Sequence, residues 1–202
     1  MKRVAIILSI FTSFLIALNN DKPNFKNLNF RFIGPDGNRA IAISGVSSDH
    51  NTYYVGAASG GLFKTTNKGI SWEPIFDDQD VSSVSAIAVS QKNPNIVWAG
   101  TGETFLIRPA HAIGDGIYKS EDGGNTWKNM GLQKTARIAK IVIHPKNDKI
   151  VYVAALGHTF GPQEDRGIYK TTNGGKTWKK ILFIDQNTGG IDIAFVRKNP
   201  NF

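Results

Sequence analysis

The sequence predicts an all-β protein assembled from repeated units of four short strands. A polar turn that ends in tryptophan occurs three times, at residues 65–72, 120–127 and 171–178. A pair of apolar segments joined by a polar turn precedes each copy. β-Branched and aromatic residues alternate with turn clusters spaced about 8–12 residues apart, which is typical of an all-β fold. No helical pattern follows residue 18.

Each unit contains four strand-like segments in a fixed order. The first is small and apolar ("SAIAV", "AKIVI"), and an Asn- or Asp-rich turn leads to the second ("IVWAG", "IVYVA"). A loop of variable length leads to the third ("GIYKS", "GIYKT"), and the repeated turn leads to the fourth ("TWKNM", "TWKKI"). The tryptophans Trp72, Trp127 and Trp178 are 55 and 51 residues apart. Four strands in a unit of about fifty residues form one blade of a β-propeller.

The predicted fold is therefore a β-propeller with three blades and the first strand of a fourth. We assign the blades to residues 40–76, 84–131 and 138–182, and the start of the next to 190–202. In the second blade, alanine alternates with bulky residues (Ala86, Ile87, Ala88, Val89), which suits the crowded innermost strand. Propellers close with about four to eight blades. We therefore expect an incomplete propeller: the front part of a longer protein or, as the alternative, a ring that closes by self-association.

The repeated turn is predicted to be scaffold. In the copy that begins at Ser120, the Asp122 carboxylate accepts backbone N–H groups across the turn. Gly124 supplies a positive φ, and Trp127 anchors the hairpin between neighbouring blades. Asparagine replaces the aspartate in the other copies and still offers one acceptor oxygen. The corresponding structural residues there are Asn67, Gly69 and Trp72, and Asn173, Gly175 and Trp178.

Residues 1–18 have the pattern of an export signal peptide. Lys2 and Arg3 precede a 15-residue apolar run, Val4 to Leu18, and polar residues follow. The run is shorter than the span of about 20 residues that a membrane helix needs, and retention as an anchor is the alternative. We expect an exported protein, periplasmic or secreted, with no membrane segment after cleavage. Residues 19–39 are a lead-in segment whose end, from residue 29, can supply an outer strand.

Composition and spacing exclude several kinds of site. The chain has no cysteine, so disulfides and cysteine-based metal or redox sites are absent. Its formal charge of +8 falls to +6 without Lys2 and Arg3. Most lysines stand singly in turns or flank the repeated tryptophans, and no run of five or six appears, so we expect no nucleic-acid partner. His50, His111, His144 and His158 lack zinc-binding spacing.

A calcium loop is conceivable at 185–192, where oxygen ligands alternate. However, Val196 stands where such a loop has its last glutamate, and a blade-linking turn is the favoured interpretation. We predict no metal and no cofactor.

Blade connectivity places the variable loops and the links between blades on one face, here called the loop face. Variable loops on a rigid scaffold are where binding sites form. The candidate ligand-binding residues there are Glu103, Phe105, Arg108, His111, Asp115, His158, Phe160, Glu164, Asp165 and Arg166. The links add Asp77, Asp78, Asp80 and Asp185.

A glycosidase needs two opposed carboxyl groups, but acids on solvated loops are usually caps or surface charges. No residue is therefore predicted to be catalytic. Phe105 and Phe160 are suited to stack on sugar rings or to grip a peptide, and are equally suited to cap the blades.

The turn pattern S/T-x-D/N-x-G-x-S/T-W resembles the Asp-box, also called the bacterial neuraminidase repeat. Phrases such as "YYVGAASGGLFKTTNKGISWEPI" look most like large exported propellers described as sortilin-like or glycosyl-hydrolase-like, over about residues 29–202. Related propellers include sialidases, xyloglucan-cleaving glycosidases, receptors and a photosystem assembly factor. The resemblance is therefore specific for the fold and leaves the function open.

The resemblance also weakens the case for catalysis in this chain. In xyloglucan-cleaving relatives an aspartate precedes a Gly-Gly pair of the first blade, and Ala58 occupies that place here. Arg31 resembles the opening Arg-Ile-Pro element of sialidases only faintly. We favour a module that binds a glycan or a protein on the loop face. The alternatives are the amino-terminal part of a glycoside hydrolase, xyloglucanase- or sialidase-like, whose other catalytic residues lie downstream, and an assembly factor.

Overall fold

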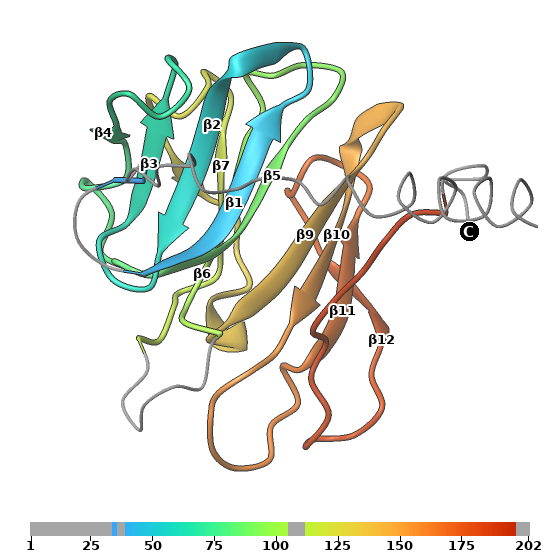
Figure 1. The fold of residues 1–202 in the computed structure, drawn as a ribbon. Helices are drawn as coiled ribbons and strands as arrows, with labels where there is room; N and C mark the ends of the chain where they lie inside the picture. Colours follow the sequence, from blue (N-terminus) through green and yellow to red (C-terminus); the bar gives the residue numbers. More distant parts are fainter. Residues whose placement is uncertain (1–33, 36–38, 105–111, 197–202) are drawn as a thin grey trace, which may run out of the picture. The chain divides into compact units, whose positions relative to one another are not determined.

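The computed structural model describes residues 34–35, 39–104 and 112–196, which form three four-stranded antiparallel sheets (Figure 1). The first contains β1 (Ala40–Val46), β2 (Asp49–Ala57), β3 (Leu62–Thr65) and β4 (Glu73–Pro74). The second contains β5 (Val84–Val89), β6 (Val97–Thr101), β7 (Ile117–Ser120) and β8 (Lys128–Asn129). The third contains β9 (Ile138–His144), β10 (Asn147–Ala155), β11 (Gly167–Thr171) and β12 (Lys179–Leu182). A short 3-10 helix, η2 (Gln133–Thr135), lies between the second and third sheets.

Each sheet is a meander in which every strand pairs with the next along the chain. In the second sheet, Ala99 of β6 pairs with Ile87 of β5 on one side and with Tyr118 of β7 on the other. The corresponding residue of the third sheet, Val153, pairs with Ile141 and Tyr169. Consecutive four-stranded meanders are the blades of a β-propeller, and the predicted fold class is confirmed.

The first strands of the blades lie side by side and line a shared cavity of about 210 Å³. Ala42, Ala86 and Ala139 are among its walls, as expected for innermost strands. Glycine in the second strand permits close packing of the next blade. A Cβ at Gly100 would overlap the side chain of Ile138, the first residue of β9. Each first strand after β1 therefore packs directly on the second strand of the preceding blade.

Two hydrophobic clusters fill the interfaces between the blades. Tyr54, Leu62, Phe76, Val84, Val97 and Tyr118 belong to the cluster between the first and second blades. Trp98, Ile117, Ile138, Ile141, Val151 and Val153 belong to the cluster between the second and third. All residues of β6 are buried, because neighbouring blades cover both of its faces. This double burial explains why the second strands are apolar without alternation.

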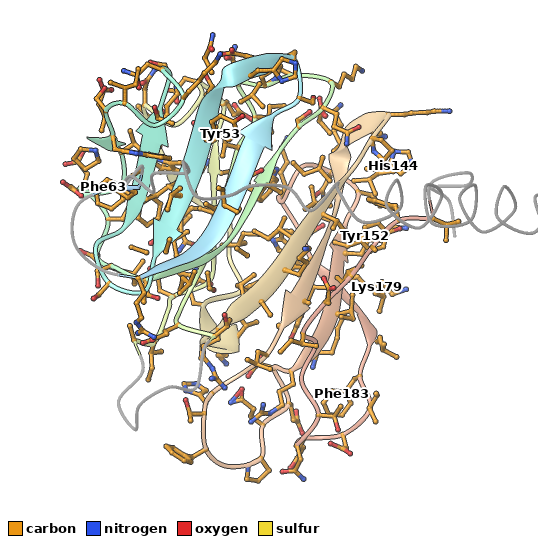
Figure 2. All side chains as sticks on the ribbon, in the orientation of Figure 1. Tyr53, Phe63, His144, Tyr152, Lys179 and Phe183 are labelled. Atoms are coloured by element: carbon orange, nitrogen blue, oxygen red, sulfur yellow. The ribbon has the colours of Figure 1, made fainter. Side chains whose placement is uncertain are left out.

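Residues 190–196, the described portion of the predicted fourth blade, form no strand. A strand requires backbone hydrogen bonds to a neighbouring strand, and no such pairing is present here within the described residues. The segment still follows the third blade. The Gly190 N–H donates to the Ala155 carbonyl at 2.9 Å. Phe195 packs edge to face on His144 and on Tyr152, with ring centroids 5.6 Å apart in both pairs; Figure 2 labels the latter two residues.

Several predictions fall on residues that the structure does not describe. The signal peptide at 1–18, the lead-in segment apart from residues 34, 35 and 39, and residues 197–202 lie outside the described ranges. Within those ranges, no helix is both long and apolar enough to span a membrane.

Candidate functional site

Backbone hydrogen bonds sort the connections into the two faces that the blade pattern predicts. On the loop face, the N–H of Leu156 donates to the Arg137 carbonyl at 2.9 Å, and the N–H of Gly114 donates to the Ala136 carbonyl at 2.7 Å. Loops within a blade are thus joined to the links between blades. On the opposite face, here called the turn face, the Gly123 N–H donates to the Asn95 carbonyl at 2.9 Å. This bond joins the repeated turn to the turn between β5 and β6.

The repeated turns share one hydrogen-bond network. In the second blade, the Gly124 N–H donates to Ser120 Oγ at 2.7 Å, and the Thr126 N–H donates to Asp122 Oδ1 at 2.9 Å. The Thr126 hydroxyl also donates to Asp122 Oδ2 at 2.6 Å. These hydrogen bonds to the ionised form lower the pKa of Asp122 to about 2, and the Thr126 hydroxyl is the largest cause.

Asparagine preserves this network by reversing one hydrogen bond. The Thr177 N–H donates to Asn173 Oδ1 at 3.0 Å, while Asn173 Nδ2 donates to Thr177 Oγ1 at 2.8 Å. Asn67 makes the same pair of contacts with Ser71, at 2.9 and 2.8 Å. Gly69, Gly124 and Gly175 all have positive φ. The geometry therefore gives these polar residues a structural part in the turns.

Two of the tryptophans join neighbouring blades. Trp127 Nε1 donates to the Ile75 carbonyl of the first blade at 2.7 Å, and its ring packs edge to face on Phe76. Trp178 Nε1 donates to the Met130 carbonyl of the second blade at 2.8 Å. In each case the acceptor is the third residue after the preceding tryptophan. Trp72 lies in the wall of an apolar pocket of about 570 Å³ on the first blade, with Tyr53 and His50.

A repeated lysine, which the sequence analysis did not predict, faces an aromatic ring in every blade. Lys64, Lys119 and Lys170 occupy the same place in the third strands, where each Nζ lies over an aromatic ring of the second strand. The rings are Tyr54, Trp98 and Tyr152, at 5.6, 5.7 and 5.0 Å from Nζ to centroid. Such contacts stabilise a cation against an aromatic face. The signal was available in the phrases "FKTT", "YKSE" and "YKTT".

Glu103 is a buried member of an ion pair. Its side chain is 0% exposed, and Arg39 Nη2 donates to its Oε1. Its backbone N–H donates to the Ala112 carbonyl at 2.8 Å. The pair connects the start of the first blade to the long loop of the second, so this carboxylate is engaged in structure.

Asp115 is also engaged. Tyr118 Oη donates to Asp115 Oδ2 at 2.5 Å, and the Asp115 N–H donates to Thr101 Oγ1 at 3.0 Å. Burial, together with the Asp115 carboxylate, raises the pKa of Tyr118 to about 12. The phenol therefore remains a proton donor to Asp115 at neutral pH and fixes the end of the loop.

Arg166 organises the loop between β10 and β11, residues 156–166. It is 7% exposed, and its guanidinium donates to the carbonyls of Leu156 at 2.6 Å, His158 at 3.0 Å and Gly161 at 3.2 Å. The side chains of His158 and Glu164 are exposed, and Asp165 is partly exposed. Phe160 is 79% exposed. The clamped loop thus holds an aromatic ring out in solvent.

Arg137 is a candidate that sequence reasoning missed. It lies in the link before β9, is 3% exposed, and donates from Nε to the Gly157 carbonyl at 2.6 Å. Burial lowers the pKa of Arg137 below its usual value, and repulsion from Arg166 adds to this effect. The position is not the same in every blade: Arg39 likewise stands immediately before the first strand of the first blade, but Ser83 does so in the second.

The remaining predicted residues are separate or lie outside the described ranges. Phe105, Arg108 and His111 belong to the undescribed segment 105–111. Asp77, Asp78 and Asp80 are exposed in the link after the first blade. Asp185 Oδ1 accepts the N–H groups of Asn187 at 2.7 Å and Thr188 at 2.8 Å, so the segment adopts a turn. In the described ranges, no three His, Asp or Glu residues gather as a metal-binding group.

The chain is similar to proteins that act on xyloglucan and to other propellers. A probable oligoxyloglucan-reducing end-specific xyloglucanase of Neosartorya fischeri is 26% identical over 153 residues, which are 72% of this chain and 16% of the relative. An ancestral GH74 enzyme superposes with a TM-score of 0.56 at 24% identity, over 78% of this chain and 20% of that one. YCF48 bound to D1 peptide superposes with a TM-score of 0.54 at 17% identity, over 78% of this chain and 46% of that one. No protein-family model matches the sequence.

The fold and these likenesses define the class as a β-propeller protein with four-stranded blades. In sequence the chain is similar to the probable xyloglucanase, of whose length it spans 16%.

Proposed function

We propose that this chain is part of an exported Asp-box propeller that binds a glycan on its loop face. The observation that carries the proposal is the loop at 156–166, in which Arg166 fixes three backbone carbonyls and Phe160 is 79% exposed. An exposed ring on an ordered loop suits stacking on the apolar face of a sugar. The sequence likeness to a xyloglucanase favours a glycan over a protein as the ligand.

Binding is favoured over catalysis because two of the loop-face acids, Glu103 and Asp115, are engaged in structural contacts. Glu103 is buried in its ion pair with Arg39, and Asp115 is hydrogen-bonded to Tyr118 and Thr101. Ala58, at the place of the relatives' first-blade aspartate, is fully buried and has no ionisable group. A two-carboxylate mechanism needs one acid that can protonate and one base that faces it. Glu103 and Asp115 are held by these contacts and are not placed to act as that acid or that base.

The test compares Phe160→Ala with Ile70→Ala in the full chain. Both side chains are large, apolar and mainly exposed, at 79% and 75%, but Ile70 belongs to a repeated turn on the turn face. Calorimetric titration would use neutral xyloglucan oligosaccharides and oligogalacturonides. Loss of one stacking contact of about 1 kcal/mol should weaken glycan binding about fivefold in Phe160→Ala. Ile70→Ala should bind as the parent chain does. Equal behaviour of the two variants, or the absence of binding to both glycans, would refute the proposal.

A second candidate is the amino-terminal part of a glycoside hydrolase, which the likeness to the xyloglucanase favours. In that case the chain by itself releases no new reducing ends from xyloglucan, whereas a longer form that contains the remaining blades does. Release of reducing ends by the chain alone would show that the loop face already holds a working pair of acids, against the assignments of Glu103 and Asp115.

A further inference from the structure

Arg137 is a buried cation with an unused hydrogen-bond donor. Its side chain is 3% exposed, its Nε donates to the Gly157 carbonyl at 2.6 Å, and its buried Nη1 has no hydrogen-bond partner among the residues that the structure describes. Nearly all buried polar groups are hydrogen-bonded, and an unpartnered one calls for an explanation. The explanation must also account for the charge, since an isolated buried ion is strongly unfavourable.

A second arginine lies beside the first. Arg166 is 7% exposed and donates to the carbonyls of Leu156, His158 and Gly161, and its buried Nε likewise has no partner within the described ranges. Carbonyl groups satisfy donors but leave the net charge in place. Among the ion pairs of the described residues, none includes Arg137 or Arg166.

Asp185 does not fill the role of counter-ion. It is near enough for Arg166 to contribute to its lowered pKa, but backbone hydrogen bonding from Asn187 is the largest cause. Its Oδ1 accepts the N–H groups of Asn187 and Thr188, and the residue is exposed. Two positive charges therefore stand together on the loop face without a bonded acid.

Two glycines leave room beside the stems of the two arginines. A Cβ at Gly102 would lie 2.9 Å from Arg137 Cγ, and a Cβ at Gly157 would lie 2.7 Å from Arg166 Cγ. Both glycines also have positive φ, at 93° and 90°, which L side chains rarely adopt. The backbone is thus shaped around the two arginine stems.

We propose that Arg137, with Arg166 beside it, binds a carboxylate group of an acidic glycan, a polyuronate, on the loop face. The guanidinium fork matches a carboxylate in charge and geometry. Phe160 lies in the same clamped loop and supplies a ring for the attached sugar. Without Lys2 and Arg3 of the predicted signal peptide the formal charge is +6, which also favours an anionic ligand. This inference rests on glycan binding as proposed above and adds the chemical class of the glycan.

The experiment titrates the full chain with a galacturonate hexamer, with the same hexamer after reduction of its carboxyl groups, and with a neutral xyloglucan oligosaccharide. The variants are Arg137→Gln and the control Lys92→Gln, which removes the same charge from an exposed site on the turn face. A charge-assisted hydrogen bond of about 1.5–3 kcal/mol corresponds to a 10- to 100-fold change in affinity. We expect Arg137→Gln to lose affinity for the hexamer by this factor and Lys92→Gln to change little. We also expect the parent chain to bind the reduced hexamer only weakly.

Each other outcome overturns the inference in a distinguishable way. Binding of the neutral oligosaccharide but not of the hexamer would refute the polyuronate and leave the proposed function standing. Binding of neither would refute both. Equal weakening by the two variants would indicate unspecific charge attraction. Binding of a short peptide through its terminal carboxylate, with no glycan binding, would assign the arginines to a protein ligand.

Thermal unfolding separates a structural role from this one. Arg137→Gln removes an uncompensated charge and is expected to unfold within a few degrees of the parent chain. A large loss of stability without ligand would show that Arg137 has a structural role. The hexamer titration of Arg137→Lys would then decide whether Arg137 also binds the carboxylate. Lysine keeps the charge but lacks the fork, so we expect affinity between those of the parent and Arg137→Gln. Full affinity in Arg137→Lys would overturn the proposed carboxylate contact.

Discussion

Asp122 is an ionisable residue at a position of the repeated turn where the other two blades have asparagine. Its carboxylate accepts from the Thr126 N–H and hydroxyl, whereas Asn173 accepts from the Thr177 N–H and donates to the Thr177 hydroxyl. Both arrangements satisfy the same polar atoms. They differ in their response to acid, because only the carboxylate can take up a proton.

We expect Asp122→Asn to fold as the parent does at pH 7 and to be less sensitive to acid. The folded-state pKa of about 2 lies below the usual value of 3.8. A depressed pKa stabilises the folded state above the unfolded-state value, and this contribution is lost as the pH falls toward about 2. The difference in unfolding free energy between variant and parent should therefore shift in favour of the variant from pH 5 to pH 3. Urea unfolding of both proteins measures it, and a difference independent of pH would contradict the assignment.

At the scale of the element, the second strand of each blade is where the next blade approaches most closely. Gly100 of β6 leaves room for Ile138 of β9, and Gly56 of β2 leaves room for the Val84 carbonyl of β5. The contact depends on the absence of a single carbon atom at each place.

We expect Gly100→Ala to destabilise the fold by about 1–3 kcal/mol, the usual cost of overpacking. Gly45→Ala is the matched control, because a Cβ there meets only the Tyr53 ring, at 3.2 Å. Neither glycine is among those with positive φ, so steric overlap is the main difference. Chemical unfolding of the two variants measures the effect. Equal stability would mean that β6 and β9 can separate without cost.

The elements also show what the sequence can and cannot predict. The repeat located the strands because four apolar segments and a tryptophan turn recur with the same spacing. It also predicted the Trp127 and Trp178 anchors, which contact the preceding blade. It gave no indication of Arg137 or of the Arg39–Glu103 pair. Arginine stands before the first strand in the first and third blades and serine in the second, and a pattern of polar and apolar residues does not show that such a charged side chain is buried.

At the scale of the whole described unit, apolar side chains are exposed at the end of the last strand, β12, and immediately after it. Ile181, Leu182, Phe183 and Ile184 are between 42% and 66% exposed. Contiguous exposed apolar surface of this kind promotes association between chains. In the second blade, the residue corresponding to Ile181 is Met130, which packs against the core cluster and accepts from Trp178.

We expect the full chain to self-associate as its concentration rises, and Ile184→Glu to reduce this without loss of stability. Ile184 is 66% exposed, so a charge there disturbs no core contact. Sedimentation velocity at several concentrations measures the association. If the parent chain remains monomeric at all concentrations tested, this apolar surface does not mediate association in solution. If Ile184→Glu associates as strongly as the parent, another surface is responsible.

The tryptophan anchors have a consequence for how such a molecule changes during evolution. At both interfaces the indole donates to the carbonyl of the third residue after the preceding tryptophan. Donor and acceptor are therefore carried by the same stretch of every unit. A unit that is duplicated or deleted in frame brings its own donor and leaves an acceptor for the next. This contact between units is therefore preserved when recombination changes their number.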